Sequence, residues 1–191
     1  MSLNTAFATA GATGGKPKLA GQRLVLDSRD LPFRCTLETQ NFRPPDEKEL
    51  TFSAYGYQGT EVCGVRLATK RVTNYSNAPA QYDEPEGIFP DGKFTCVECD
   101  RDNGAKHKGS QYIDIWKLAL RGSGQMERLT YFNRYPGYKA SNPVTSDDGK
   151  FLALPSADGT VPLVDVLTGK EVAEVVEELQ QEFAPASVRA E

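Results

Sequence analysis

Short runs in which apolar and polar residues alternate recur along most of the chain. In residues 33–40 (FRCTLETQ), Phe33, Cys35 and Leu37 are separated by polar neighbours. A period of two is the pattern of a strand with one buried face. Comparable short runs bounded by turn-forming residues occupy residues 21–30, 49–55, 61–67, 94–100, 112–118, 151–159 and 159–171. The pattern predicts an all-β chain of short antiparallel strands.

The two ends of the chain depart from this pattern. Near the C-terminus, apolar residues recur at helical spacing, at Val172, Val175, Val176, Leu179 and Phe183. This spacing predicts an amphipathic helix that starts at Thr168 or Gly169 and, with its tail, makes up residues 169–191. Residues 1–18 are rich in small residues and have neither a basic segment nor a long apolar run. They predict a disordered arm without an export signal of its own, and this composition fits equally well a stretch that follows a removed leader.

One segment of the sequence occurs as two similar copies. Residues 128–151 (RLTYFNRYPGYKASNPVTSDDGKF) align without a gap on residues 71–94 (RVTNYSNAPAQYDEPEGIFPDGKF), 57 positions upstream. A repeat with a fixed period indicates supersecondary units that bury their apolar faces against one another. The strands that precede the copies align at an offset of 51 instead. A hairpin loop longer by six residues in the second copy accounts for that difference.

Three motifs in and around the second copy resemble the repeats of the TolB-type, WD-like β-propeller family. They are DIW at 114–116, RLT at 128–130 and PVTSDDGK at 143–150, in the order of that family. The third motif departs from the family by having Thr145 for an aromatic residue and Asp147 for a proline. Its Asp-Gly pair suits a tight hairpin, because glycine accepts a positive φ. The resemblance implies antiparallel four-stranded blades over residues 19–168.

The length of the chain limits the number of blades. Closed propellers have roughly four to eight blades, and at roughly 40–50 residues per blade the 191 residues supply no more than four. We therefore expect an incomplete propeller of roughly three to four blades. Such a stack needs further blades or self-association to cover its edge strands.

Composition and charge exclude some classes of partner. The net charge is -4 and Lys and Arg form no long cluster, so the chain lacks the basic face of a nucleic-acid-binding protein. No apolar run approaches the length of a membrane-spanning helix. The compartment is not fixed by the sequence. The resemblance implies the periplasm, with the cytoplasm as the alternative.

Candidate metal and catalytic residues are few. Cys96 and Cys99 form C-x-x-C in a predicted strand, where residues three apart point to opposite faces, so we interpret them as ordinary strand residues. The loop that starts with Asp100 and Asp102 begins like a calcium loop but lacks the remaining carboxylates. The only histidine, His107, lies between two lysines, and we expect it to face solvent. We therefore predict no cofactor, metal site or catalytic residue.

Function is expected in the loops, which are rich in aromatic residues. Together with Tyr131 and Phe132, the candidate binding residues are Tyr75, Tyr82, Asp83, Glu84, Arg134, Tyr135, Tyr138 and Lys139. Aromatic residues and arginine dominate binding hot spots, but tyrosines also pack between blades, and both interpretations stay open. The first hypothesis is a non-catalytic scaffold that binds a protein partner or, as a lesser option, a carbohydrate.

The alternative hypothesis is an enzyme that acts on carbohydrate or peptide in a propeller pocket, as a lyase or a hydrolase. Some similar propellers, such as oligogalacturonate lyases, hold a metal with several histidines, and others carry a hydrolase domain elsewhere in the chain. This sequence has one histidine and no G-x-S-x-G motif. The missing residues favour binding over catalysis.

Overall fold

A computed structural model of the chain describes residues 2–9, 18–56, 59–104, 106–155 and 160–172. Nearly all regular structure is β, as the alternating pattern predicts. The strands are β1 (Ser2–Thr9), β2 (Lys18–Asp27), β3 (Thr36–Phe42), β4 (Glu49–Tyr55), β5 (Thr60–Arg66), β6 (Val72–Asn74), β7 (Asp83–Ile88), β8 (Phe94–Cys99), β9 (Asp114–Ala119), β10 (Met126–Arg128), β11 (Val144–Thr145), β12 (Phe151–Ala153) and β13 (Leu163–Asp165). Two short 3-10 helices, η1 (Ser28–Asp30) and η2 (Phe132–Arg134), complete the elements.

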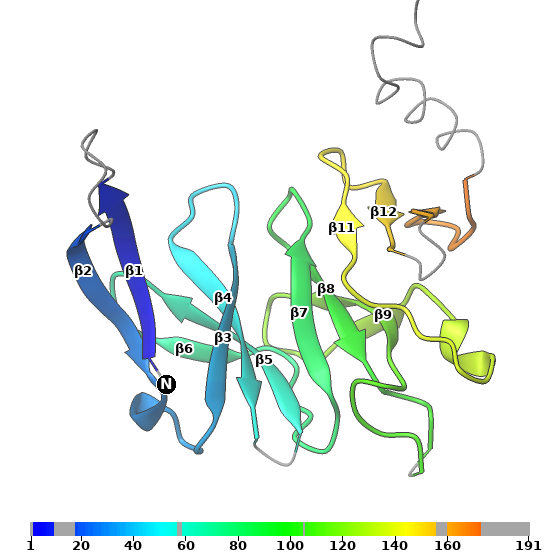
Figure 1. Ribbon diagram of the computed structural model, residues 1–191, viewed down its shortest axis with the longest axis horizontal. Helices are drawn as coiled ribbons and strands as arrows, with labels where there is room; N and C mark the ends of the chain where they lie inside the picture. The colour runs from blue at the N-terminus through cyan, green and yellow to red at the C-terminus, as the bar shows by residue number, and fades with distance from the viewer. Residues whose placement is uncertain (1, 10–17, 57–58, 105, 156–159, 173–191) are drawn as a thin grey trace, which may run out of the picture.

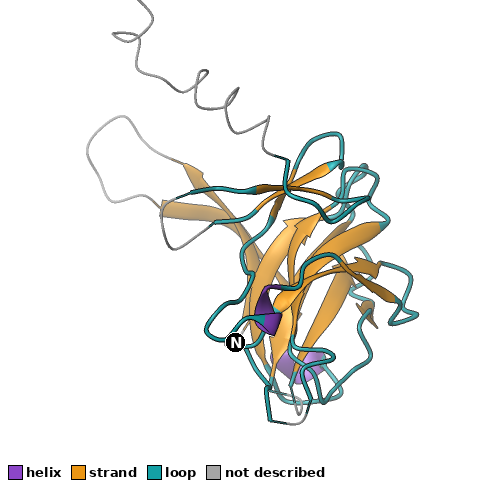
Figure 2. Cartoon of the chain, turned by 90° about the vertical axis from the view of Figure 1, so that its right-hand side faces the viewer, coloured by secondary structure: helices purple, strands orange, loops and turns teal. Residues whose placement is uncertain are grey.

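The strands form four antiparallel sheets, each a meander in chain order. Blade 1 pairs β1 with β2, blade 2 has the order β3-β4-β5-β6, blade 3 has β7-β8-β9-β10 and blade 4 has β11-β12-β13. The blades follow one another along the long axis of the molecule (Figure 1). Figure 2 shows their strands overlapping in projection, with loops around them. This is a partial β-propeller, as the resemblance implies.

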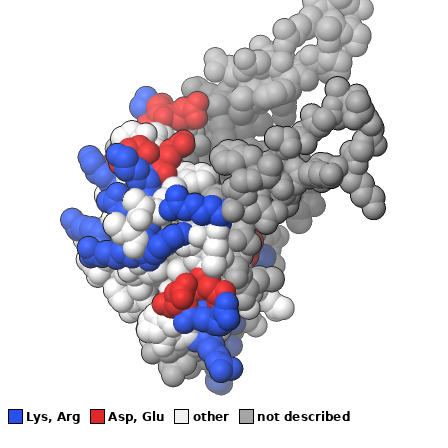
Figure 3. All heavy atoms as spheres, turned by 90° about the vertical axis from the view of Figure 1, so that its left-hand side faces the viewer, with Lys and Arg blue, Asp and Glu red and all other residues white. Residues whose placement is uncertain are grey.

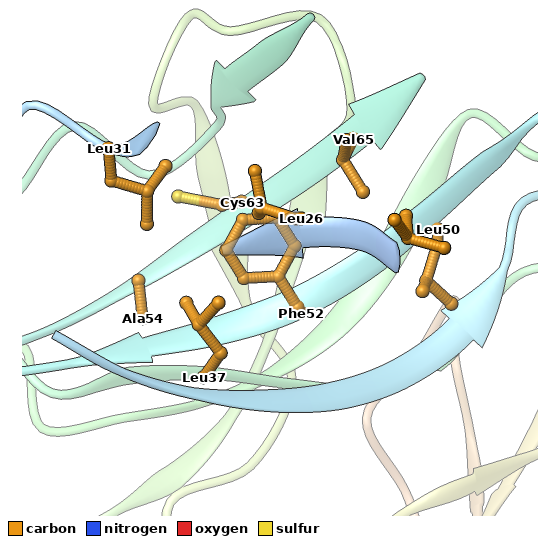
Figure 4. Close-up of a cluster of buried hydrophobic side chains, with 9 residues drawn as sticks. Leu26, Leu31, Leu37, Leu50, Phe52, Ala54, Cys63 and Val65 are labelled. Carbon is orange, nitrogen blue, oxygen red and sulfur yellow. The ribbon is translucent and has the colours of Figure 1, made fainter. Parts of the chain in front are cut away.

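Three apolar clusters join the four blades. The first lies between blades 1 and 2 and surrounds Phe52, which packs against Leu26, Leu37 and Leu50 (Figure 4). The second joins blade 2 to blade 3, and the third joins blade 3 to blade 4. Each blade thus buries its faces only against its neighbours, which is the packing of a repeat protein.

Cys96 and Cys99, on opposite faces of strand β8, contribute to two different interfaces between blades. Both thiols are buried and free. Cys96 belongs to the cluster between blades 3 and 4, whereas Cys99 belongs to the cluster between blades 2 and 3. The prediction that the two residues lie on opposite faces of one strand is confirmed.

The Asp-Gly turns keep the predicted repeat spacing. Phe94 and Phe151, 57 residues apart, each begin the second strand of a blade. The glycines before them, Gly92 and Gly149, have φ values of +66° and +71°, which residues with a Cβ seldom adopt. At Gly92 an added Cβ would lie 2.0 Å from the carbonyl oxygen of Pro44 in blade 2, so this turn also requires glycine for close packing between blades.

The predicted alignment of Arg71 with Arg128 is wrong. In blade 2, Cys63 pairs with Asn74, and in blade 3 the corresponding pair is Trp116 with Arg128. Arg128 therefore corresponds to Asn74. The hairpin loops before β6 and β10 differ by one residue in length rather than by the six expected. The same register places Ser76 and Thr130 in matching positions, where their hydroxyls accept from Val62 N and Ile115 N. Pairing across the sheet, rather than residue identity, fixes which residues are equivalent.

An arginine from the β3–β4 loop connects blades 2 and 3. Arg43 donates from Nε to the carbonyl oxygen of Gly92 (2.7 Å) and from Nη2 to that of Leu120 (3.1 Å). Within its own blade it pairs with Glu49 at 3.3 Å. With the Tyr75 hydroxyl, to which Nη1 donates (3.2 Å), the guanidinium group thus serves four acceptors at once, which its rigid fork of donors allows.

Both ends of the chain differ from the sequence prediction. Ser2–Thr9, placed in a disordered arm by its composition, is strand β1 and pairs with β2. Backbone pairing needs no large side chain, so small residues do not exclude a strand. At the other end, Glu171 forms a β-bridge with Val164, and residues 169–172 are not helical. The remainder of the predicted helix, from residue 173, lies outside the described residues.

No helix in the described ranges is long and apolar enough to cross a membrane. Figure 3 views the molecule from the side of the N-terminal strands, where Lys and Arg side chains lie next to Asp and Glu side chains. Charges of both signs share this face.

Candidate binding site

The topology of blade 3 brings two loops to one end of its sheet. Strand β9 is antiparallel to both β8 and β10. The end of β8, the start of β9 and the end of β10 therefore lie together, and so do the loops 100–113 and 129–143 that leave them. η2 lies in the second loop, at the right of Figure 1. Between the loops is an open groove of about 1130 Å³, here named the loop groove. Its lining residues are Asp102, Asn103, His107, Gln111, Tyr112, Trp116, Arg128, Tyr131, Asn133, Arg134, Tyr135, Pro136, Gly137, Tyr138 and Lys139.

A buried carboxylate holds the second loop in place. Asp114, at the start of β9, is fully buried. Its Oδ1 accepts hydrogen bonds from Thr130 Oγ1 (2.7 Å) and Phe132 N (2.8 Å). Its Oδ2 accepts from Asn133 N (3.2 Å) and forms an ion pair with Arg128 Nη2 (2.6 Å). All four contacts lie at the root of the groove, so they fix the start of the loop that carries its aromatic residues.

Two arginines and two aromatic rings stack along the groove. The guanidinium carbon of Arg128 lies 5.5 Å from the ring centre of Trp116 and 4.6 Å from that of Tyr131. The guanidinium carbon of Arg134 also lies over the Tyr131 ring, 4.2 Å from its centre. At these distances each guanidinium group is attracted to the negatively polarised face of the aromatic ring that it covers. The stack orders the side chain of Arg134, which is otherwise on the exposed surface.

Large aromatic side chains are exposed at the mouth of the groove. Tyr135 and Tyr138 are 65% and 64% exposed and lie edge to face, with ring centres 6.5 Å apart. From the first loop, Tyr112 packs its ring against that of His107 at 4.9 Å. Lys139 Nζ donates to the carbonyl oxygen of Ser110 (3.1 Å), which ties the two loops together. The rings are thus displayed on a braced surface.

Four of the eight predicted binding residues line this groove. They are Arg134, Tyr135, Tyr138 and Lys139, and the side chains of all four are exposed. For these four, the surface interpretation fits the structure better than packing between blades. The other four lie elsewhere, in the layer between blades 2 and 3.

Tyr75 and Asp83 are interior residues. The Tyr75 hydroxyl donates to Glu49 and accepts from Arg43 Nη1 (3.2 Å), and burial followed by the hydrogen bond to Glu49 raises the pKa of this phenol. Asp83 is fully buried and pairs with Arg101 at 3.1 Å. Burial raises the pKa of the Asp83 carboxyl, and the charge of Arg101 opposes that rise. Tyr75 thus belongs to the apolar cluster between blades 2 and 3, and Asp83 forms a buried ion pair within blade 3.

Tyr82 and Glu84 lie at a cluster of three carboxylates, of which Glu84 and Glu98 are buried and Glu86 is half-buried. Glu84 accepts hydrogen bonds from the hydroxyls of Tyr55 and Tyr82. Carboxylate oxygens of Glu84, Glu86 and Glu98 lie within 4.8 Å of one another. Burial, with a contribution from neighbouring acids, raises the pKa values of Glu86 and Glu98 to about 7 each. Three converging carboxylate oxygens could hold a divalent cation, and the raised pKa values of Glu86 and Glu98 mean that such a cation would compete with protons at these two groups.

The loop that resembles a calcium site at its start uses its first carboxylate for structure. Asp100 is buried and accepts hydrogen bonds from Tyr82 N (3.0 Å) and Gly109 N (2.6 Å). It also lies 3.6 Å from Lys108 Nζ. These contacts close the loop on itself. Within the described residues, the imidazole ring of His107 hydrogen-bonds only to the carbonyl oxygen of Asn103 and contacts no serine or carboxylate by a hydrogen bond or ion pair.

Sequence reasoning missed the groove residues of the first loop. Tyr112 and Trp116 were assigned to a strand, and Asn103 and His107 to a solvated turn. The signal was available in the strand order, because a meander places the β8–β9 loop beside the segment that follows β10. Composition alone did not connect two loops that are distant in sequence.

No protein-family model and no curated protein matches the sequence. Solved structures do match. A protein assigned as TolB from Agrobacterium tumefaciens superposes with a TM-score of 0.58 at 19% identity, over 88% of this chain and 60% of that chain. One of two prolyl endopeptidases superposes with a TM-score of 0.53 at 14% identity, over 88% of this chain and 27% of that chain. TolB from Acinetobacter baumannii gives a TM-score of 0.49 at 20% identity, over 87% of this chain and 39% of that chain.

The similarity concerns the fold. At 19% identity, the likeness to the Agrobacterium protein shows a TolB-like β-propeller fold, and the chain spans less than two thirds of the length of either TolB protein. No residue of the loop groove is assigned by these comparisons. The groove has to be interpreted from its own chemistry.

Proposed function

We propose that this TolB-like partial propeller is a non-catalytic binding module that captures a protein partner at the loop groove. The observation that carries the proposal is the exposed pair Tyr135 and Tyr138, displayed edge to face on a loop that is anchored at its root. Tyrosines supply a large contact area at a low cost in conformational entropy, and they are enriched at binding hot spots.

The construction of the groove supports a protein partner. Protein interfaces combine buried aromatic anchors with arginine and a polar rim. Here Tyr135 and Tyr138 supply the anchors, Arg134 lies beside them, and Asn103 and Gln111 belong to the same lining. An open groove of about 1130 Å³ accommodates a peptide segment or a protruding loop better than it encloses a small metabolite.

The test is the double variant Tyr135→Ala, Tyr138→Ala. Both rings project into solvent, so we expect the free energy of unfolding to change by less than about 0.5 kcal/mol. Proteins captured by the immobilised full chain would be identified by mass spectrometry, expressed, and titrated against each variant. A partner that binds wild type and loses at least about tenfold in affinity for the double variant supports the proposal.

Two single variants serve as controls. Phe42→Ala removes an aromatic side chain that is 45% exposed but lies outside the groove, and it should keep the partner. Tyr75→Ala removes a buried ring and should destabilise the fold by about 3–5 kcal/mol. Equal affinity of a captured partner for wild type and the double variant would contradict the proposal.

The resemblance to TolB-type propellers also leads us to propose a periplasmic location. Cell fractionation with antibodies against the full-length protein would test it. Recovery with cytoplasmic markers would contradict it.

A further inference from the structure

We propose that the loop groove recognises an acidic peptide segment, in which a carboxylate binds Arg134 and a neighbouring apolar side chain packs on Tyr135 and Tyr138. This inference rests on the proposed function and specifies the chemistry of the partner. It starts from a difference between the two arginines of the groove.

Arg128 is already neutralised. Its Nη2 lies 2.6 Å from Asp114, and its Nε donates to the carbonyl oxygen of Thr130 at 2.8 Å. Only 11% of its side chain is exposed. This arginine is committed to the architecture of the loop and has little capacity for a ligand.

Arg134 also stacks on Tyr131, but unlike Arg128 it forms no ion pair with a carboxylate of the described residues. Its guanidinium carbon lies 4.2 Å from the centre of Tyr131, and the residue is exposed. In the described part of the chain, no carboxylate lies within ion-pair distance of Arg134. Stacking covers a flat face of the guanidinium and leaves its N–H edge open. An ordered guanidinium with an open edge is suited to bidentate recognition of a carboxylate.

The remaining charges of the groove favour an anion of low charge. Arg134 and Lys139 are not paired with acids in the described residues, and Asp102 is the one acidic residue of the lining. Lys139 also donates to a carbonyl oxygen, so it adds positive potential without being the primary contact. The whole chain carries a net charge of -4, which repels polyanions at longer range. One or two carboxylates match this balance better than the phosphates of a nucleic acid.

The tyrosine pair supplies the second half of the recognition. Tyr135 and Tyr138 lie with their rings at 78° to each other, three residues apart on the same loop as Arg134. An apolar side chain next to the bound carboxylate can cover both rings. Burial of that contact also lowers the local dielectric and strengthens the ion pair at Arg134. An acidic residue followed or preceded by an apolar one is therefore the expected ligand.

Selection from a random-sequence peptide display library tests this inference, with the immobilised full chain and two variants as baits. Arg134→Gln removes the charge of the groove arginine. Arg121→Gln is the matched control, because Arg121 is an exposed arginine of the β9–β10 hairpin that does not line the groove. We expect wild type and Arg121→Gln to enrich peptides with aspartate or glutamate beside an apolar residue. Arg134→Gln should lose the acidic preference and keep the apolar one.

A synthetic peptide with the selected consensus gives the quantitative readout by fluorescence anisotropy. Replacing its glutamate by glutamine should weaken binding to wild type by about tenfold, the size expected of a charge-assisted contact. The same replacement should have little effect on binding to Arg134→Gln, because the two groups act as one pair. Binding to wild type should also weaken as salt rises.

Three outcomes would overturn the inference. Selected peptides without acidic enrichment, whose binding is still lost in the Tyr135→Ala, Tyr138→Ala variant, would refute it and leave the proposed binding module intact. Binding of a phosphoserine version or of polyuridylate about tenfold tighter than the glutamate peptide would make the groove a phosphate site. Failure of wild type to select any peptide, together with partner capture that does not depend on the tyrosine pair, would refute both proposals.

Discussion

Replacing Asp114 by asparagine tests whether one buried carboxylate holds the loop groove in shape. The substitution keeps the volume of the side chain and replaces one acceptor oxygen by an NH2 group. Each Asp114 oxygen accepts two hydrogen bonds, from Thr130 and Phe132 on one side and from Arg128 and Asn133 on the other. In either orientation of the asparagine, its NH2 group faces two donors.

The expected loss is large because Arg128 would keep its charge without a partner. Its side chain is 11% exposed and that of Asp114 is 0% exposed. Removing one member of a buried ion pair costs about 3–5 kcal/mol. We therefore expect Asp114→Asn to lower the free energy of unfolding by about 3–5 kcal/mol and to weaken binding at the groove.

Urea unfolding followed by tryptophan fluorescence measures this loss. The chain has a single tryptophan, Trp116, which is buried and stacks on Arg128, so its emission reports on this region. Asp148→Asn is the matched control, because Asp148 lies on an exposed turn with Ser146 and Lys150, and its removal should change the midpoint much less. An Asp114→Asn midpoint equal to that of wild type would refute the anchoring role.

Three further predictions concern the fold. Burial raises the pKa of Glu98 from 4.5 to about 7. The stability that its protonated form contributes is therefore complete below pH 4.5 and is lost as the pH rises through 7. Glu98→Gln should remove up to about 3 kcal/mol of that decline in the free energy of unfolding, measured by urea titrations at different pH. Glu86, whose pKa is also raised to about 7, keeps its own share of the decline, so a decline as large in the variant as in wild type would contradict this. Gly92→Ala should destabilise more than Gly149→Ala, because both have positive φ but only the first places a Cβ 2.0 Å from a carbonyl oxygen; equal melting temperatures would be the contrary result. Phe52→Ala should cost about 3–5 kcal/mol in urea unfolding, whereas Phe42→Ala, which is half exposed, should cost less than about 1 kcal/mol; similar losses would place the core elsewhere.

The strands and the fold class could be predicted from the sequence, because each depends on local alternation and turn chemistry. Residues 33–40 and 49–55 show period two; strand β4 occupies the predicted positions, and β3 overlaps the prediction but begins three residues later, at Thr36. The Asp-Gly turn at Gly149 is likewise local. The equivalence of Arg128 with Asn74 was not predictable in this way, since it depends on cross-strand pairing with Trp116 and Cys63.

Half of the residues predicted to bind a partner line the loop groove. Arg134, Tyr135, Tyr138 and Lys139 could be selected from the sequence because aromatic and cationic residues are adjacent in this stretch of the chain. Tyr75 and Asp83 were predicted on the same grounds but are buried. Burial depends on how the surrounding strands and blades pack, which the residue type alone does not determine. Tyr112 joins the groove from a loop distant in sequence, and only the meander order of the strands brings it there.

The contacts of Arg43 bear on how such a chain can arise and diverge. Its bonds to the neighbouring blade end on the carbonyl oxygens of Gly92 and Leu120, atoms that every residue possesses. A hydrogen bond to a main-chain carbonyl does not require a particular side chain in the neighbouring blade. These two hydrogen bonds can therefore persist when the side chains around Leu120 change, and the loops at the other end of the blade can acquire a new ligand without losing them.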